Sequence, residues 1–594
     1  MISERIEALR SLMKERNIDA YIIPTADFHE SEYVGDYFKC REFMSGFTGS
    51  AGTLVVTEKK AGLWTDGRYF LQAEKQLNDS EIELYRMGNE GVPGIYDFLL
   101  ENVPENGVIG FDGRTVSAGQ GIEYETIADI KSGHIFYDED LVDLIWTDRP
   151  ALSCKPVYLI DERKAGASRR EKLAGLRKKM KENEASVHVI STLDDIAWLL
   201  NIRGDDIAYN PVALSYVLLT EDECLLFVQP EAVSENVRRS LEADGVIVLN
   251  YDGFYEYVKK IKKPVLMDYE RISYALIKNL DADIEKADEQ NPTILMKAVK
   301  NSSEIEGMRE AHIKDGVAVA RFMHWLKTNI GRLPITEMSA ADRLEEFRKE
   351  QPGFFEPSFE TISAYASNGA IVHYSPLSDT DRRLESRGFL LVDSGGQYTN
   401  GTTDITRTFV LGEITKEQRM HYTAVLKGML ALADAKFRYG CTGHNLDYIA
   451  REPLWRMGLD YNHGTGHGVG FMLNVHEAPN SFRWREAGGS AGTVIEPGMI
   501  TSDEPGVYIA GSHGIRIENL ILCVEKEKNE YGRFLGFEHL TMAPIDLDGI
   551  DMDLMGEMDI KRLNTYHESV YNALSPYMSE EDCIWLREYT KAIK

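Results

Sequence analysis

The N-terminal half of this chain contains the same helix-then-strand pattern twice, so its fold must accommodate a repeated unit. Residues 9–15 (LRSLMKE) are echoed by residues 176–182 (LRKKMKE), and each stretch has the apolar spacing of an amphipathic helix. Residues 54–57 (LVVT) and 217–220 (VLLT) follow in the same order as short apolar strands. Helices that alternate with such strands predict two similar α/β units.

The length of 594 residues leaves room for further structure beyond these units, which we place at residues 1–150 and 151–295. The capping-box pattern Ser-Glu-Ile-Glu at 303–306 opens a long amphipathic helix and indicates a third domain over 296–543. Short strands between Gly, Asn-Gly and Pro-Gly turns favour a mixed α+β structure there. Residues 544–594 are first acidic and then helical in pattern, and we interpret them as a C-terminal extension.

The composition restricts the partners of the chain. It has 66 Lys and Arg residues against 96 Asp and Glu residues, and this net charge of −30 repels nucleic acid and anionic membranes. No run approaches the ~18–20 apolar residues of a membrane span, and the N-terminus has no apolar signal stretch. The six cysteines contain no Cys-x-x-Cys pair, which argues against a disulfide framework or a thiolate metal site. We therefore expect a soluble cytoplasmic protein that binds neither nucleic acid nor membranes.

Two aspartates border a predicted β-hairpin in the third domain. A buried strand (Phe-Leu-Leu-Val) ends at Asp393, and the returning segment Thr-Thr-Asp-Ile-Thr carries Asp404. The two carboxylates face each other if the turn is centred between Tyr398 and Thr399. An opposed, buried pair would repel and favour a cation between the carboxylates, whereas two solvated turn aspartates would need none.

Further potential metal ligands lie later in the same domain. They occur in the glycine-rich run from His463 to His467, in the Asp-Glu-Pro-Gly segment that holds Glu504, and in the strand that holds Arg516 and Glu518. Residues two apart on a strand share a face, so Arg516 and Glu518 should point to the same side. With the two aspartates, these segments supply four carboxylates and one imidazole, which is a hard ligand set suited to two divalent ions.

Together these motifs resemble the pita-bread metallopeptidases, and specifically the Xaa-Pro aminopeptidases. The matching runs are VDSG at 392–395, TTDITR at 402–407 and HGTGHG at 463–468. GFTGSAGT at 46–53 and LWTDGRYF at 63–70 resemble the first domain of the three-domain members. The resemblance implies two creatinase-like N-terminal α/β domains followed by a C-terminal pita-bread catalytic domain, a combination of α/β and α+β classes.

The resemblance also implies a dinuclear metal centre, with Mn²⁺ as the expected ion. The family order of ligands, Asp, Asp, His, Glu and Glu, is matched by Asp393, Asp404, His467, Glu504 and Glu518. In such a centre, a hydroxide that bridges the two ions attacks the scissile carbonyl. Glu504 matches the family position that also takes the proton of the water and passes it to the departing nitrogen.

Several histidines match family positions that contact the substrate. His373 and His476 match positions that hydrogen-bond the substrate carbonyl and the developing oxyanion, so both are candidate catalytic residues. His463 is expected on the leaving-group side, and His467 would adjoin the substrate as well as the metal. For His373, His476 and His463, a structural role with hydrogen bonds inside the protein is the alternative interpretation.

Two arginines complete the implied site. Arg516 is expected to orient Glu518 or a substrate carboxylate. Arg68, from the first domain, matches a family position that reaches the substrate in the neighbouring subunit, which would make a homodimer part of the active site. A surface salt bridge is the alternative role for Arg68.

The function implied is a metal-dependent aminopeptidase that cleaves between an N-terminal residue and a following proline. A prolidase that cleaves Xaa-Pro dipeptides is the alternative among enzymes, because the two activities share their metal ligands. A non-catalytic peptide-binding relative is the alternative of another class, although such relatives lose ligands and this chain keeps all five.

One further cluster combines potential metal ligands near the N-terminus, namely Asp27, His29, Glu30 and Glu32. We interpret it as a solvated loop and not as a metal site.

Overall fold

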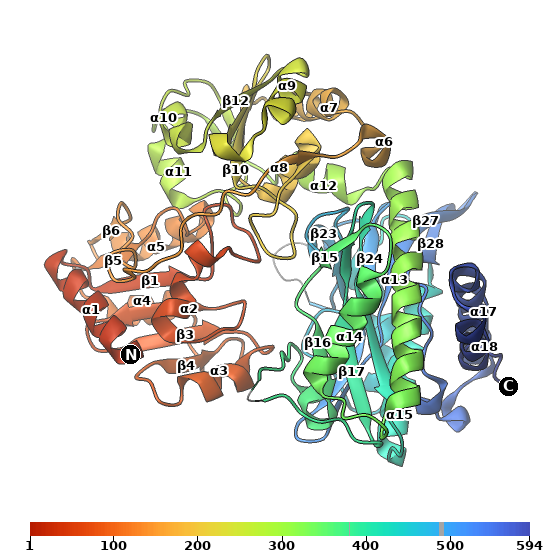
Figure 1. The fold of residues 1–594 in the computed structure, drawn as a ribbon. Helices are drawn as coiled ribbons and strands as arrows, with labels where there is room; N and C mark the ends of the chain where they lie inside the picture. Colours follow the sequence, from red (N-terminus) through yellow and green to blue (C-terminus); the bar gives the residue numbers. More distant parts are fainter. Residues whose placement is uncertain (379, 486–491) are drawn as a thin grey trace. The chain divides into compact units, whose positions relative to one another are not determined.

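The computed structural model describes residues 1–378, 380–485 and 492–594 (Figure 1). Its contacts divide the chain into two compact units. Unit 1 comprises Met1–Glu162 and Ala167–Thr293, and unit 2 comprises Arg163–Gly166 and Ile294–Lys594. In the described ranges, no helix combines the length and the apolar character needed to cross a membrane.

The first part of unit 1 is a six-stranded sheet with the strand order β4-β3-β2-β1-β5-β6. Helix α1 covers it with an apolar stripe, since Ile6, Leu9 and Met13 are all buried. The strands are β1 (Ala20–Pro24), β2 (Thr53–Thr57), β3 (Ala61–Thr65), β4 (Glu83–Arg86), β5 (Val108–Phe111) and β6 (His134–Phe136). The helices are α1 (Ile2–Glu15), α2 (Cys40–Ser45), α3 (Phe70–Leu77), α4 (Ile95–Asn102) and α5 (Ala118–Ile130).

The second part of unit 1 is another six-stranded sheet, with the order β12-β11-β10-β8-β13-β14. Its strands are β8 (Val187–Ile190), β10 (Ser215–Thr220), β11 (Cys224–Val228), β12 (Val246–Asn250), β13 (Val265–Met267) and β14 (Lys286–Asp288). Its helices are α7 (Arg169–Glu182), α8 (Leu193–Leu200), α9 (Glu235–Ala243), α10 (Phe254–Val258) and α11 (Tyr274–Asn279).

The two sheets of unit 1 have the same topology. The central pair β1–β2 is antiparallel, as is β8–β10, whereas β1–β5 and β8–β13 are parallel. The stretches LVVT and VLLT lie in the equivalent strands β2 and β10. The predicted repeat is therefore confirmed as two α/β sheets, while the residue boundaries near 150 and 295 stay predictions.

The acidic cluster near the N-terminus is not the solvated loop expected from the sequence. Asp27 and His29 are fully buried, and only Glu32 is exposed. The ring of His29 lies between the carbonyl oxygen of Ser191 (2.9 Å) and the hydroxyl of Tyr251 (2.8 Å), which both come from the second sheet region of unit 1. The loop is buried because this second region packs over it, which the local sequence pattern does not reveal.

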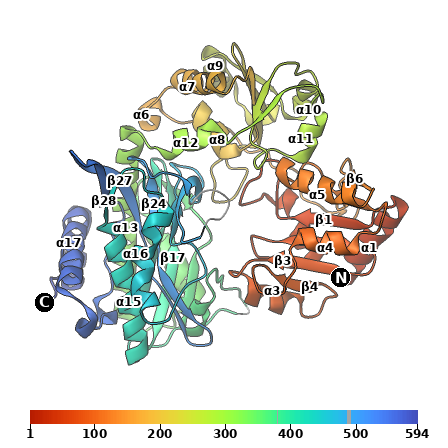
Figure 2. The same cartoon turned by 180° about the vertical axis from the view of Figure 1, so that it is seen from behind.

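Unit 2 contains a six-stranded sheet of order β21-β28-β27-β24-β22-β23, two three-stranded sheets (β16-β17-β20 and β15-β18-β19) and the pair β25-β26. Helix α14 contacts β16, whereas α15 and α16 contact β28 and β23 (Figures 1 and 2). The helices are α12 (Pro292–Ala298), α13 (Ser302–Asn329), α14 (Glu337–Lys349), α15 (Lys416–Ala433) and α16 (Gly443–Trp455). The strands are β15 (Phe354–Pro357), β16 (Ile362–Tyr365), β17 (Phe389–Ser394), β18 (Gly396–Tyr398), β19 (Gly401–Thr402), β20 (Ile405–Val410), β21 (Lys436–Arg438), β22 (Gly466–Gly468), β23 (Glu477–Phe482), β24 (Ile500–Asp503), β25 (Gly506–Ile509), β26 (His513–Arg516), β27 (Asn519–Asn529) and β28 (Gly532–His539).

Helix α13 begins two residues earlier than the predicted capping box. Its N-cap is Asn301, whose side-chain oxygen accepts from the backbone N–H of Glu304 at 3.1 Å, and the Glu304 carboxylate accepts from the Asn301 N–H at 3.0 Å. The prediction that Ser303 caps the helix is therefore wrong. Both positions fit the motif, but the Asn301 amide also donates to the Ala165 carbonyl at 2.8 Å, and this tertiary contact supports the earlier start.

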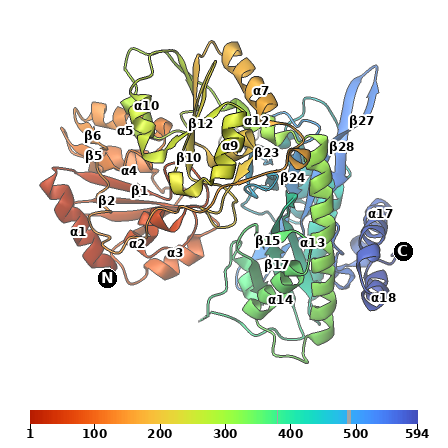
Figure 3. The same cartoon turned by 45° about the horizontal axis from the view of Figure 1, so that its top comes forward.

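The C-terminal segment forms helices α17 (Glu557–Leu574) and α18 (Glu580–Tyr589). Helix α17 packs against α13 and α15, and α18 packs against α13 (Figure 3). Buried side chains of α17, including Leu563 and Val570, belong to the same hydrophobic cluster as Val425 of α15. The segment is thus integrated into the core of unit 2.

Candidate functional site

The hairpin that carries the two aspartates has a register different from the one expected. Asp393 lies opposite Thr406, so its predicted pairing with Asp404 is wrong. The pair of Tyr398 with Gly401 leaves a two-residue turn, which places the turn centre one residue later than predicted. Gly401 is part of the strand and packs on α13, where an added Cβ would lie only 2.9 Å from the nearest side chain.

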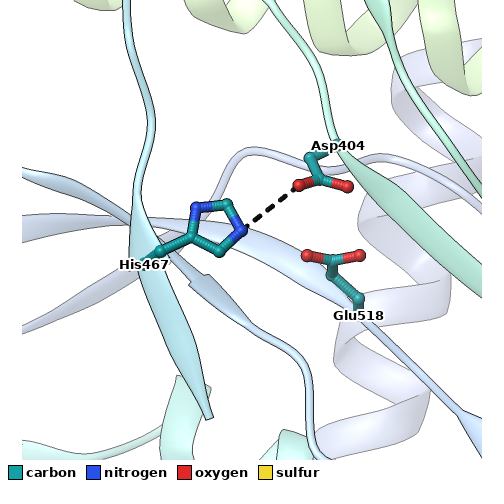
Figure 4. Close-up of side chains that lie close together, drawn as sticks. All are labelled: Asp404, His467 and Glu518. Atoms are coloured by element: carbon teal, nitrogen blue, oxygen red, sulfur yellow. Dashed lines mark ion pairs between the residues drawn. The ribbon is translucent and has the colours of Figure 1, made fainter. Parts of the chain in front are cut away.

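Three of the predicted ligands form one compact cluster. Asp404, His467 and Glu518 each offer a ligand atom within 4.8 Å of the others (Figure 4). The Nε2 atom of His467 lies 3.4 Å from an oxygen of Asp404 and 3.5 Å from an oxygen of Glu504. The four residues lie within strands or directly beside them, namely before β20, in β22, after β24 and before β27. Rigid strands therefore bring together ligands from distant parts of the sequence.

The fifth predicted ligand, Asp393, joins this cluster through Arg516 and Thr406. Arg516 donates to one carboxylate oxygen of Asp393 at 2.6 Å and to the Thr406 hydroxyl at 3.2 Å. Thr406 in turn donates to Glu518 at 2.7 Å. The other oxygen of Asp393 is buried and has no hydrogen-bond partner in the described structure. Arg516 thus contacts Asp393 directly, and it reaches Glu518 through the Thr406 hydroxyl.

The carboxylates of this cluster repel one another. Burial raises the pKa of Glu518 well above its ordinary value, and the charges of Asp404, Glu504 and Asp393 add to the increase. Burial likewise raises the pKa values of Asp404 and Glu504. Burial alone would lower the pKa of His467, but Asp404 and Glu504 raise it to about 9. A divalent cation would relieve this repulsion and replace the protons that the metal-free site holds.

The hairpin before Asp404 is held by a buried network. Thr403 donates from its hydroxyl to Asp315 of α13 at 2.7 Å, and Asp315 is paired with Arg348 of α14 at 2.6 Å. The carbonyl of Thr403 accepts from the Ser358 hydroxyl at 2.7 Å. These contacts fix the backbone one residue before Asp404. Sequence reasoning did not identify Thr403 or Asp315.

His463 is held by Tyr508, another residue that sequence reasoning missed. The Nδ1 atom of His463 lies 2.7 Å from the Gly464 carbonyl, which can only accept, so Nδ1 carries the proton. The Nε2 atom therefore accepts from the Tyr508 hydroxyl at 2.8 Å, and Arg516 donates to that hydroxyl at 2.7 Å. Burial lowers the pKa of His463 well below its ordinary value, and the Arg516 charge adds to the effect. Tyr508 lies on β25 only two residues after Gly506, which was the available signal.

Of the remaining predicted site residues, His476 and His373 lie near other histidines of the site, whereas Arg68 belongs to unit 1. The ring of His476 stands edge-on to that of His467, with 4.4 Å between the ring centroids. His373 lies near enough to His463 for its charge to lower the pKa of that histidine further. Arg68 lies in unit 1, where its guanidinium pairs with Asp66 at 2.7 Å, the salt bridge that was its alternative role.

Comparisons with known proteins agree with this geometry. Residues 306–525 match the model of "Metallopeptidase family M24", and 533–593 match "C-terminal region of peptidase_M24". Residues 5–133 and 148–304 each match a model of "Creatinase/Prolidase N-terminal domain". These matches correspond to the two repeated sheets and to the unit that holds the carboxylate cluster.

Similar proteins extend over the full chain. A probable Xaa-Pro aminopeptidase P of Pyrenophora teres is 40% identical, with 99% of this chain and 92% of the relative covered. Aminopeptidase P2 of Arabidopsis thaliana is 39% identical, with 97% and 86% covered. An X-prolyl aminopeptidase structure from Caenorhabditis elegans, described as a cytosolic enzyme with a di-nuclear active site, is 35% identical, covers 100% of both chains and has a TM-score of 0.95.

The chain therefore belongs to metallopeptidase family M24. Its full-length relatives place it with the Xaa-Pro aminopeptidases of that family. The predicted family resemblance is confirmed, and so is the predicted fold class, with creatinase-type N-terminal domains followed by the catalytic domain.

Proposed function

We infer that the protein is a metal-dependent aminopeptidase that hydrolyses the bond between an N-terminal residue and a following proline. The observation that carries this inference is the cluster of Asp404, His467 and Glu518, which lie within strands or directly beside them and next to Asp393 and Glu504. The names of the full-length relatives supply the proline specificity. A site with four carboxylates and one imidazole suits divalent cations, whereas a peptide-binding relative would have no need to keep it.

The residues of the cluster fit two divalent metal ions, which we propose to be Mn²⁺. The buried, unpartnered oxygen of Asp393 suits a positive partner. Burial raises the pKa values of Glu504 and Glu518, and the neighbouring carboxylates raise both further. Asp393, Asp404, His467, Glu504 and Glu518 would hold the ions. When bound, the ions would lower the pKa of a water molecule and polarise the scissile carbonyl.

The side chains around the proposed ions are assigned to proton transfer and to hydrogen bonding with the substrate. Glu504, whose oxygens lie 3.5 Å from His467 and 3.9 Å from His463, is proposed to accept the proton of the attacking water and to deliver it to the proline nitrogen. His373 and His476 are proposed to donate to the substrate carbonyl and to the oxyanion. His463 engages both of its nitrogens within the protein, so its proposed substrate contact uses the edge of the ring.

We further propose that the enzyme is a homodimer in the cytosol and that Arg68 reaches the substrate bound in the neighbouring subunit. The cytosolic location is supported by the description of the C. elegans relative. A surface aromatic cluster on unit 2 supports self-association, because Tyr448, Trp455 and Trp484 are 54%, 37% and 36% exposed. The ring centroid of Trp455 lies 5.8 Å from that of Tyr448 and 5.8 Å from that of Trp484. Solvent-exposed aromatic clusters of this kind mark interaction surfaces.

The test of the activity compares three substrates of one N-terminal residue: Xaa-Pro-Yaa, Xaa-Ala-Yaa and the Xaa-Pro dipeptide. We expect the first to have the highest kcat/KM, because proline has no N–H and a specialised site must recognise its ring instead. Preference for the dipeptide would indicate a prolidase, and equal turnover of the alanine peptide would contradict proline specificity. Complete chelation should abolish turnover and added Mn²⁺ should restore it, whereas full activity without metal would contradict the dinuclear proposal.

A further inference from the structure

Arg407 is a buried cation next to the proposed metal site. It lies on β20, is 2% exposed, and follows Thr406 directly. Its five N–H groups lie within hydrogen-bond distance of six uncharged oxygens. Nε faces the Pro544 carbonyl, Nη1 faces the carbonyls of Thr406 and Glu518, and Nη2 faces the Ala543 carbonyl, the Asn519 amide oxygen and the Tyr566 hydroxyl. A buried guanidinium keeps its position only when its donors are satisfied, so each acceptor contributes to where Arg407 sits.

Arg407 fixes the backbone that presents Glu518. One of its nitrogens lies 2.6 Å from the Glu518 carbonyl and 2.9 Å from the Thr406 carbonyl. The N–H of Glu518 donates to the same Thr406 carbonyl at 3.1 Å, and the Thr406 hydroxyl donates to the Glu518 carboxylate at 2.7 Å. The guanidinium thus holds together the two segments whose spacing sets the Glu518 carboxylate.

The last acceptor of Arg407 comes from the C-terminal helix α17. The Tyr566 hydroxyl is buried and lies 2.9 Å from Arg407 and 2.8 Å from the Ala543 carbonyl. A hydroxyl has one proton, so Tyr566 donates to Ala543 and accepts from Arg407. It also lies 3.3 Å from the Asn519 amide oxygen, one residue after Glu518. Tyr566 therefore supplies a hydrogen-bond acceptor to Arg407 from a helix that contributes no proposed metal ligand.

We propose that Tyr566 is a positioning residue of the metal site. Through Arg407 it holds residues 518–519, so helix α17 contributes to metal affinity in addition to its contribution to folding. This inference rests on the proposed function, since it assumes that Glu518 is a metal ligand. Removal of the hydroxyl takes away one of the three acceptors around Nη2 of Arg407, so that nitrogen settles on the oxygens of Asn519 and Ala543 alone. The guanidinium then shifts, and with it the Glu518 backbone that Nη1 holds. Ligand–metal distances are expected within about 0.2 Å of their standard values, so a shift of the Glu518 backbone should weaken metal binding.

The test measures Mn²⁺ binding to the full chain after its metals have been removed. Isothermal titration calorimetry at 25 °C gives the dissociation constants for the wild type and for Tyr566→Phe, which removes a single oxygen. We expect Mn²⁺ to bind about tenfold more weakly to the variant, in line with losses of 10–100-fold for residues that support metal ligands. Binding with the wild-type dissociation constant would overturn the proposal.

Two control variants on the same helix separate positioning from stability. Tyr571→Phe removes a half-buried hydroxyl that does not contact Arg407, and it should leave both Mn²⁺ affinity and Tm unchanged. Val570→Ala opens a cavity in the core next to α17, and it should lower Tm without changing Mn²⁺ affinity. If Val570→Ala weakens Mn²⁺ binding as much as Tyr566→Phe at an equal loss of Tm, the effect of Tyr566 is general destabilisation and the proposal is wrong.

A second variant approaches the same contact from the other side. Arg407→Lys keeps the charge but cannot reproduce the planar array of donors, so it should weaken Mn²⁺ binding at least as much as Tyr566→Phe. Unchanged affinity in this variant would also overturn the proposal. The titration of the wild type separates the proposed function from the proposed role of Tyr566. If the metal-free wild type takes up no Mn²⁺, the proposed function is wrong. If the wild type and all variants bind two ions with equal affinity, only the role of Tyr566 is wrong.

Discussion

Glu504 has two proposed roles, as a metal ligand and as the acceptor of the water proton, and both depend on its carboxylate. Replacement by Gln keeps the shape but removes the negative charge and the proton acceptor. We expect kcat to fall by about 10²–10⁴-fold while the fold is retained. Steady-state kinetics and circular dichroism measure the two effects. Glu530→Gln, at an exposed position, is the control and should keep wild-type kinetics; a Glu504→Gln enzyme with near-normal kcat and bound metals would reject the assignment.

Thr403 permits a stricter comparison, since serine keeps its hydroxyl and valine keeps its shape. Thr403→Val removes one of the two donors to an oxygen of the buried Asp315 and takes the acceptor from the buried Gly396 N–H, so the free energy of unfolding should fall by about 1–3 kcal/mol. Thr403→Ser retains the donor and should lose less. Urea denaturation of both variants provides the measurement. Equal losses for the two would mean that the methyl group matters and the hydroxyl does not.

At the scale of single elements, the contact between the aspartate hairpin and α13 depends on Gly401. An added Cβ would lie 2.9 Å from the Ala311 Cβ and 3.0 Å from the Met308 sulfur, so the hairpin and the helix must separate. Gly401→Ala should lower stability by about 1–3 kcal/mol, the usual cost of overpacking. Gly253→Ala, with no neighbour within 4 Å, is the matched control. A Gly401→Ala protein as stable as this control would show that the contact can relax freely.

Helix α17 should make the protein sensitive to acid through His567. Burial lowers the pKa of His567 to about 3, and the charge of Arg407 contributes, whereas the unfolded chain binds this proton near pH 6.5. Between these values the unfolded state holds more protons, so stability falls as the pH falls. At pH 5 this difference amounts to about 2 kcal/mol.

The contribution of His567 can be isolated by comparison with His567→Asn, which cannot titrate. The wild type should lose more stability than the variant between pH 7.5 and pH 5 in chemical denaturation. Parallel stability profiles for the two proteins would contradict a depressed pKa at this position.

Helices and strands could be predicted from the sequence where they depend on local patterns. Features that depend on tertiary contacts, such as the hairpin register and the burial of a loop, could not. The amphipathic helices and the apolar strands of the repeat were predictable because the spacing of apolar residues along the sequence indicates them. The hairpin register was not, because the place of Gly401 depends on α13, about ninety residues earlier. The buried state of Asp27 and His29 likewise depends on a second sheet region that the loop composition does not indicate.

At the scale of the whole molecule, the same division applies to the site. The proposed metal ligands could be identified from the sequence because each of them lies in a recognisable motif. They are Asp393, Asp404, His467, Glu504 and Glu518. The residues that hold the ligands, such as Tyr508 and Tyr566, carry no motif, since any element that reaches the right depth could supply a hydroxyl. Positioning residues therefore become visible only when distant segments are seen together.

The homodimer proposal makes the last prediction, which concerns the surface of unit 2. Sedimentation should give about twice the chain mass of 67.2 kDa. Tyr448→Glu introduces a charge at the most exposed ring of the aromatic cluster, and it should shift the protein toward monomers because an unpaired charge cannot be buried cheaply in an interface. Tyr531→Glu, at a ring that is 70% exposed on the β27–β28 turn, is the matched control and should leave the mass unchanged. If Tyr448→Glu remains a dimer, self-association uses another surface; if the wild type is a fully active monomer, Arg68 has no neighbouring subunit to serve.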